Sequence, residues 1–436
     1  MSDGVEERFE AYVDGLAGVL GHADRTAGLR DYCTGLLLPL ERKSVEPLAA
    51  ATAPSRVSAQ HQSLMHFVSQ SAWSDERLLA KVRDLVLPVV EGHGPIEAWI
   101  IDDTGFRKQG RHSVGVARQY LGEIGKQDSC QVAVSLSLAN AWASLPVAFQ
   151  LYLPKDWAYD PARRKKAGVP DGIGFATKPQ IALEQIRWAV TAGLPPGVAL
   201  MDPGYGHDAG LREDLTALGV AYVAGVLSSA TVWAPGIAPP AGAGRLKPGD
   251  RRPAQAISAK AAAVSLPQEA WRTIEWREGS NAVLSSRFAR VRLYSAHRGG
   301  AGEPAPEWLL VEWPEGEEAP TKYWLATLPE DLAFERLGGA GQAALAHRAR
   351  LPGPQAGTRP RPLRRPKLAR LPSPRQPLHR RLRLPDLRAG DDSPLRTWSR
   401  PAKRADWPSR RLPTPRRRRS DPNGISPTRS PQCDDG

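Results

Sequence analysis

The chain has 436 residues, three cysteines and a net charge of +13. Cys33, Cys130 and Cys433 show no paired spacing, which excludes a disulfide framework and a zinc site built on cysteine pairs. No run of about 18 apolar residues occurs, and the first residues lack a signal-peptide pattern. We therefore expect a cytoplasmic protein with no membrane partner.

The basic excess is confined to the C-terminal quarter. Residues 338–436 contain 24 Lys and Arg against 7 Asp and Glu, whereas the rest of the chain contains 35 against 39. The same segment has 17 prolines and no Glu, Phe or Tyr. Because it cannot bury enough apolar surface to offset the conformational entropy lost on folding, we expect a disordered tail. The net charge therefore says little about the folded part of the chain.

Residues 1–90 carry apolar side chains at helical spacing, separated by polar breaks. One such set is Leu64, Phe67 and Val68, and a second begins at Leu78 and Leu79. This spacing predicts an N-terminal helical domain with its apolar stripes packed in a core.

From residue 91 the pattern changes to that of a sheet. Residues 96–101 (IEAWII) predict a buried strand that ends on Asp102 and Asp103. Residues 131–138 and 147–153 predict two further strands, and the three together favour an antiparallel meander. Helix and strand then alternate over 178–192, 198–201, 211–218 and 221–226. The layout of residues 91–226 is therefore that of an α/β domain with a mixed sheet.

Residues 227–320 interrupt this layout. Pro and Gly crowd 235–249, and strand-like stretches follow at 273–278, 288–294 and 308–313. We interpret the segment as a β-rich insertion. Residues 321–337 then resume the core with a last strand over 322–328 and the start of a helix.

Acidic residues follow two of the predicted core strands, Asp102 and Asp103 after the first and Asp202 after residues 198–201. Carboxylates at the ends of buried strands in one sheet can converge on a divalent metal, and hard oxygen ligands suit Mg²⁺. Two such ions can activate an attacking hydroxyl and stabilise the leaving oxygen of a phosphodiester. The alternative is structural, because Asp is also a common turn former and helix N-cap, and Asp202-Pro203-Gly204 has the composition of a turn.

Five blocks, in order, resemble the DDE-superfamily endonuclease transposases of bacterial insertion sequences. They cover most of residues 30–337: RKSVEPLAA (42–50), HQSLMHFVSQSAW (61–73), IDDTGFRKQGRHSVGVARQYLGEIGKQDSCQVAVSLSLAN (101–140), ALMDPGYG (199–206) and KYWLATLPEDLAFERL (322–337). The resemblance implies a ribonuclease-H-like catalytic fold that uses Mg²⁺ or Mn²⁺. It also implies transposon ends and target DNA as partners, with a homodimer and association with the nucleoid.

Carried over onto this sequence, the family's first catalytic aspartate falls in Asp102-Asp103-Thr104. Asp102 is preferred as the metal ligand, because ribonuclease-H-like folds commonly use an Asp-x-Ser/Thr pattern, and Asp103 is kept as the alternative. The second matches Asp202, where this chain has Met201-Asp202-Pro203 in place of the family's usual Ala-Asp-x.

Two groups of basic residues are candidate contacts to DNA phosphates. Lys108, Arg111, Arg118 and Lys126, with His112, lie beside the first aspartates. The run Arg163, Arg164, Lys165 and Lys166 precedes Pro170. The bland alternative for both groups is a solvated basic surface.

The third carboxylate of the family, a Glu on a helix after the strand at 322–328, has no counterpart, and the resemblance stops at Leu337. The codons of Gly338 to Gly357 are compatible with a shifted frame that reads VGLAKLRWRIERDYQDLKQ, and those of Leu363 to Leu384 with YEGRNWRGFHHHASLCIAAYGF. Both strings resemble the family's continuation. The missing Glu codon would straddle Arg348 and Ala349.

The sequence thus predicts a transposase that cuts insertion-sequence ends and joins them to target DNA, in a copy inactivated by loss of the third acid through a frame change. The alternative is a non-catalytic remnant that binds DNA ends and could inhibit an intact transposase.

Overall fold

The computed structural model describes residues 3–108, 110–239, 255–277, 283–296 and 305–330. The predicted helix start at 331–337 and the tail at 338–436, with Arg348 and Ala349, lie outside these residues. Within them, no helix is both long and apolar enough to cross a membrane.

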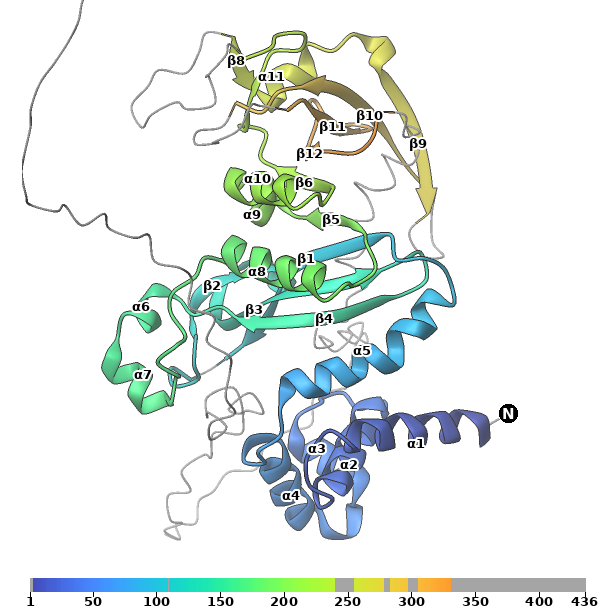
Figure 1. The fold of residues 1–436 in the computed structure, drawn as a ribbon, viewed down its shortest axis with the longest axis vertical. Helices are drawn as coiled ribbons and strands as arrows, with labels where there is room; N and C mark the ends of the chain where they lie inside the picture. The colour runs from blue at the N-terminus through green and yellow to red at the C-terminus, as the bar shows by residue number, and fades with distance from the viewer. Residues whose placement is uncertain (1–2, 109, 240–254, 278–282, 297–304, 331–436) are drawn as a thin grey trace, which may run out of the picture. The chain divides into compact units, whose positions relative to one another are not determined.

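The N-terminal region is helical, as its periodicity predicts (Figure 1). Its five helices are α1 (Asp3–Ala17), α2 (Arg25–Leu37), α3 (Val45–Thr52), α4 (Val57–Ser69) and α5 (Asp75–Glu91), with a 3₁₀ turn at Pro54–Arg56. Ser74 caps α5 by accepting a hydrogen bond from the Arg77 amide, and two acidic residues occupy the first turn, where they complement the helix dipole. Buried Leu16, Leu29 and Phe67 belong to one of two small cores in this region.

After the helical region, most of the strands form one mixed sheet. Its core strands are β1 (Ala98–Arg107), β2 (Ala117–Leu121), β3 (Lys126–Ala139), β4 (Ser144–Leu151), β5 (Val198–Met201) and β6 (Tyr222–Val226). β3 is antiparallel to β1 on one side and to β2 and β4 on the other, while β5 runs parallel to both β1 and β6. The order β4-β3-β1-β5-β6 and these directions confirm the α/β class and the ribonuclease-H-like arrangement.

The strands that follow extend the same sheet. β12 (Lys322–Ala326) pairs antiparallel with β6, and β11 (Glu307–Pro314), β10 (Val283–Leu293) and β9 (Trp271–Arg277) continue in that order. A separate two-stranded sheet joins β7 (Thr231–Trp233) to β8 (Ala256–Ser258), which leads into α11 (Ala259–Val264). A 3₁₀ turn at Gln268–Ala270 precedes β9.

The strand predicted at 96–101 is shorter than the observed strand β1. β1 continues through Asp102 and Asp103 to Arg107, so these acids lie within a strand and not after it. The reason is β3, which has 14 residues and pairs with β1 along all ten of its positions. Ladder pairing with a long neighbour overrides the weak strand propensity of Asp and Gly. The strand β2 was also missed.

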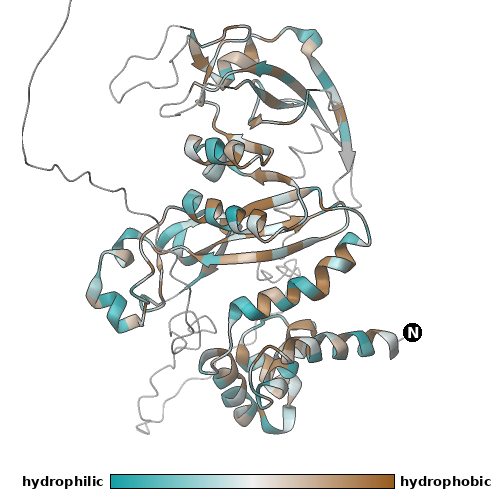
Figure 2. Cartoon of the chain, viewed as in Figure 1, coloured by the Kyte–Doolittle hydropathy of each residue, from teal (hydrophilic) through white to brown (hydrophobic). Residues whose placement is uncertain are grey.

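One face of the sheet carries helices α8 (Lys178–Thr191) and α10 (Ala209–Ala217). Buried Ile186 and Leu215 from these helices pack with Trp99, Ile101 and Met201, and α5 joins the same cluster. The opposite face holds a cluster of strand residues and Leu328, among them Ile100, Leu200 and Trp324. Figure 2 shows this concentration of hydrophobic residues in the strands and the mixed faces of α5.

A buried polar network links the core to β11. Arg212 of α10 and Glu307 of β11 are both less than a tenth exposed, with Nε and Oε1 3.9 Å apart. Arg212 also donates to the Gly206 carbonyl and to Ser295, and the Tyr222 hydroxyl donates to Glu307. Burial, and then the charge of Glu307, raise the pKa of Tyr222 above its usual range. The phenol therefore stays neutral and acts as a donor.

Substitution Glu307→Gln removes the charge that compensates buried Arg212. We expect the free energy of unfolding to fall by about 3–5 kcal/mol, because an unpaired buried charge is costly. The control is Arg187→Met, which breaks an ion pair with Asp214 whose two side chains are each 45% exposed; its cost should stay below about 1 kcal/mol. Urea unfolding of the full-length variants tests this, and equal costs for the two substitutions would contradict it.

Candidate active site

Asp102 and Asp202 occupy neighbouring positions on the parallel strands β1 and β5. The last paired residues of these strands are Ile101 and Met201, and each aspartate is the next residue. The backbone of Asp202 is still extended, with φ −77° and ψ 173°. The Asp102 carbonyl accepts a hydrogen bond from the buried Ser135 hydroxyl at 3.1 Å. The register of β1 and β5 therefore places the two aspartates next to each other on neighbouring segments of chain.

Asp103 lies on the other face of β1, because successive strand residues point to opposite faces. It shares that face with Ile101, toward α8. Its carboxylate accepts hydrogen bonds from the Lys178 ammonium at the start of α8 and from the Tyr205 hydroxyl. Both oxygens of Asp103 are therefore engaged in tying β1 to two helices.

All three aspartates affect the pKa of Tyr205. The residue is 2% exposed, and this burial is the largest cause that raises its pKa above the usual range. The charge of Asp103 and the hydrogen bond to it follow, and the charges of Asp102 and Asp202 add to the same effect. The phenol therefore stays protonated and donates to Asp103, and all three carboxylates lie close enough to act on it.

The turn after Asp202 is packed against the backbone of β6. It forms the short helix α9 (Pro203–Gly206), which Asp202 caps by accepting a hydrogen bond from the Gly204 amide at 2.8 Å. A Cβ on Gly206 would lie 2.3 Å from the Gly225 carbonyl oxygen, and one on Gly225 would lie 2.8 Å from the Cδ of Pro203. Only glycine fits at either contact, and this close packing fixes where Asp202 sits. Asp202 is therefore both the N-cap of α9 and the residue that directly follows β5.

Two carboxylates on adjacent strands match the preference of Mg²⁺ or Mn²⁺ for oxygen ligands, with further positions left to water and phosphate. Among the residues that the structure describes, no three His, Cys, Asp or Glu side chains are arranged to hold one metal ion.

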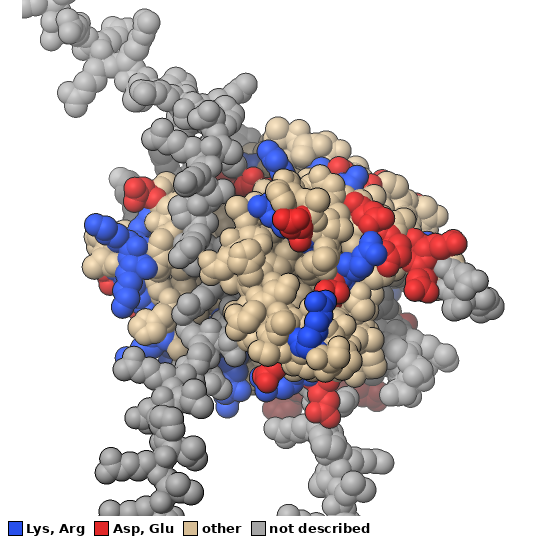
Figure 3. Space-filling view, turned by 90° about the horizontal axis from the view of Figure 1, so that it is seen from below, with Lys and Arg blue, Asp and Glu red and all other residues tan. Residues whose placement is uncertain are grey.

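The basic candidates divide by exposure. Arg111, Arg118 and Lys126 are exposed and Lys108 is half-buried. In the run at 163–166, the two arginines are half-buried and serve the local fold, whereas Lys165 and Lys166 are exposed. Arg163 donates to the Arg111 carbonyl at 3.1 Å, so this run and the loop after β1 lie together. On the face shown in Figure 3, basic and acidic side chains both occur among uncharged ones, and neither sign covers it.

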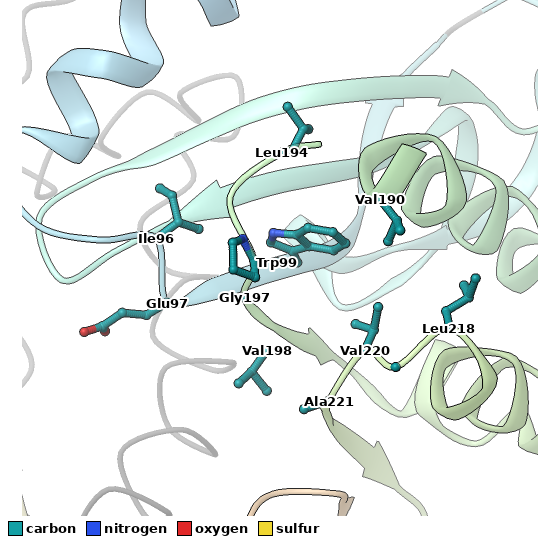
Figure 4. Close-up of a pocket in the computed structure, with 12 residues that line it drawn as sticks. Ile96, Glu97, Trp99, Val190, Leu194, Gly197, Val198, Leu218, Val220 and Ala221 are labelled. Carbon is teal, nitrogen blue, oxygen red and sulfur yellow. The ribbon is translucent and has the colours of Figure 1, made fainter. Parts of the chain in front are cut away.

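A shallow apolar pocket lies at the opposite end of the same strands. Trp99 and Val198, near the starts of β1 and β5, line it with Val190 and Leu218 (Figure 4). None of the three aspartates lines this pocket, so it is not part of their site.

Lys178 and Tyr205 are site residues that the sequence-based reasoning missed. Lys178 lies at the first position of a predicted helix, and nothing in its local pattern indicates a contact to a residue 75 positions earlier. Tyr205 was quoted within a motif, but only the packing of α9 directs its hydroxyl to Asp103.

Comparison with known proteins identifies the family of the chain. The sequence model of a family described as DDE superfamily endonuclease matches residues 15–283, more than half of the chain. A probable transposase for insertion sequence element IS701 from Microchaete diplosiphon is 31% identical over 173 residues, which are 40% of this chain and 41% of that relative. The matched part thus spans about two-fifths of the relative's length. The resemblance seen in the sequence blocks is confirmed, and the chain belongs to the DDE superfamily endonucleases.

Proposed function

We propose that this chain is a transposase of the insertion-sequence type, built to cut DNA at the element's ends and join it to a target. The observation that carries this proposal is that Asp102 and Asp202 each come directly after the last paired residues of two parallel strands, Ile101 and Met201. The relative that carries a transposase name supports the same function. Transposon ends and target DNA are the substrates in this proposal, and a homodimer in the nucleoid is its expected form.

In this proposal Asp102 and Asp202 are the metal ligands, and Asp103 has a different role. Mg²⁺ or Mn²⁺ bound there would activate the attacking oxygen and stabilise the leaving oxygen of a phosphodiester. Asp103 holds β1 against α8 and α9 through Lys178 and Tyr205 and thereby keeps its neighbour Asp102 in place. Exposed Lys165 and Lys166, with Arg111, Arg118, Lys126 and Lys108, supply phosphate contacts, while Arg163 and Arg164 hold the local fold.

We further propose that this copy is catalytically inactive. The family's third acid is a Glu, and residues 338–436 contain none. The shifted frame that restores the family's Arg-Trp-Arg-Ile-Glu sequence supports a frame change near Leu337 and Gly338. Without the third carboxylate, two aspartates can bind one ion weakly but cannot complete a two-metal site.

A non-catalytic DNA-binding remnant is the second candidate function. The N-terminal helices support it, because they pack around cores of their own with buried Leu20, Leu48 and Leu64. A product that binds the element's ends without cutting them would compete with an intact transposase for those ends.

The assignment of the ligands predicts a pattern of metal binding. Asp102→Asn and Asp202→Asn should each weaken Mn²⁺ binding by about tenfold or more, as removal of a carboxylate ligand from a hard-ion site does. Asp103→Asn should weaken Mn²⁺ binding less than either of these variants, because this residue positions Asp102 and does not bind the ion itself. Titration of Mn²⁺ followed by electron paramagnetic resonance measures the affinities.

The control for these variants is Asp214→Asn, which neutralises a half-exposed carboxylate paired with Arg187. It should bind Mn²⁺ as wild type does. Loss of binding in Asp103→Asn, with binding retained in Asp102→Asn, would reverse the roles of the two residues.

The proposed frame change predicts that the full-length chain binds DNA carrying the element's ends but does not nick it in Mg²⁺ or Mn²⁺. A version that reads the shifted frame after Leu337 should nick the same DNA. Sequencing of the encoding DNA over codons 325–360 shows whether that frame is open, and a gel assay with end-labelled DNA measures nicking. Cleavage by the full-length chain as it stands would refute the inactive state.

A further inference from the structure

The segment between β4 and α8 leaves and rejoins the sheet beside the aspartates. At its start, the Tyr152 amide donates to the carbonyl of Val132, whose register partner in β1 is Gly105. At its end, Lys178 bonds to Asp103. Residues 152–177 therefore form an excursion whose start is anchored on β3, the neighbour of β1, and whose end is anchored on Asp103 itself. They include the short helices α6 (Lys155–Ala158) and α7 (Pro161–Ala167).

Buried Trp157 fixes the excursion in place. Its side chain is 1% exposed, and its indole N–H donates to the Val116 carbonyl at 2.8 Å. The Arg163 guanidinium lies over its ring, 3.7 Å from the centroid. These contacts make the excursion a rigid support, held from one side by the loop between β1 and β2.

Two aromatic rings and an ammonium group lie on this support. Tyr159 is 70% exposed, and its ring centroid is 6.0 Å from that of Phe175. The Lys155 ammonium is 5.3 Å from the Phe175 centroid. Phe175 precedes Lys178 by three residues, so it lies within about 11 Å of it along the chain. Only three residues of chain thus separate Phe175 from the residue that bonds Asp103.

An exposed tyrosine ring paired with a half-buried phenylalanine ring among cations matches the chemistry of an unpaired nucleotide. Stacking on a ring needs an open base face, which a paired and stacked duplex does not offer, and the neighbouring lysines suit the phosphates on either side. Exposed Lys155, Lys165 and Lys166 supply that charge.

We propose that Tyr159, Phe175 and Lys155 form a stacking platform for an unpaired base of the DNA strand next to the aspartates. This inference rests on the proposed DNA substrate and adds a binding site to it. A base that stacks there would hold a DNA strand unpaired over residues 152–177, whose end is bonded through Lys178 to Asp103, the neighbour of Asp102.

The test uses the full-length protein in EDTA, so that no cleavage occurs. One DNA is a fully paired duplex, and the second carries a short run of unpaired bases with 2-aminopurine among them. Raised salt weakens the phosphate contacts of the Arg-rich residues 338–436, so that base stacking contributes more of the signal. Fluorescence anisotropy gives the two affinities, and the 2-aminopurine emission reports stacking directly.

Wild type should prefer the DNA with unpaired bases and change its 2-aminopurine emission. Tyr159→Ala should weaken binding to that DNA by about 5- to 100-fold and leave binding to the paired duplex within about twofold. Tyr159→Phe keeps the ring and should behave as wild type. Trp142→Ala removes another exposed aromatic side chain, which lies beside His93 just after β3, at the opposite end of the sheet, and should have no effect.

The outcomes separate the two proposals. If wild type binds neither DNA, the proposed function fails and this inference fails with it. If wild type binds both DNAs but Tyr159→Ala keeps the preference and the emission change, the platform is wrong and the DNA substrate stands. An equal loss on both DNAs for Tyr159→Ala would make the residue a general contact and would also overturn the platform.

Discussion

The parallel pairing of β1 with β5 is the constraint on which the site depends. Only four register pairs join the two strands, from Ala98 with Val198 to Ile101 with Met201. A shift of one residue would turn Asp202 to the other face and separate it from Asp102. The apolar residues of both strands oppose such a shift, since Ile101 and Met201 are buried on the α8 face and Ile100 and Leu200 on the other. Core packing therefore sets the positions of the acids.

Much of this arrangement could be predicted from the sequence. Patterns within short stretches of sequence are enough to predict the helices of residues 1–90 and the strand at 198–201. They also predict the meander of β1, β3 and β4. The family blocks located Asp102, Asp103 and Asp202. The motif itself leaves the choice between Asp102 and Asp103 open, because both acids fit it.

The parts that could not be predicted depend on contacts between distant residues. β1 runs on to Arg107 because the long strand β3 lies beside it, which a window of a few residues cannot reveal. The link from Lys178 to Asp103 joins residues far apart in the chain. The basic run at 163–166 looks uniform in the sequence, but packing against Trp157 half-buries Arg163, whereas Lys165 and Lys166 are exposed.

The Arg212–Glu307 contact has a consequence for how such a chain can change over generations. Glu307 belongs to β11, one of the strands that extend the sheet beyond β6, whereas Arg212 belongs to α10 and holds the carbonyl of Gly206, at the end of the turn that begins at Asp202. A deletion that shortened residues 227–320 to a loop would remove Glu307. The buried Arg212 guanidinium would then be left without its carboxylate partner, next to the turn that begins at Asp202. Arg212 and residues 227–320 therefore depend on each other, and a related chain that loses these residues must also replace Arg212.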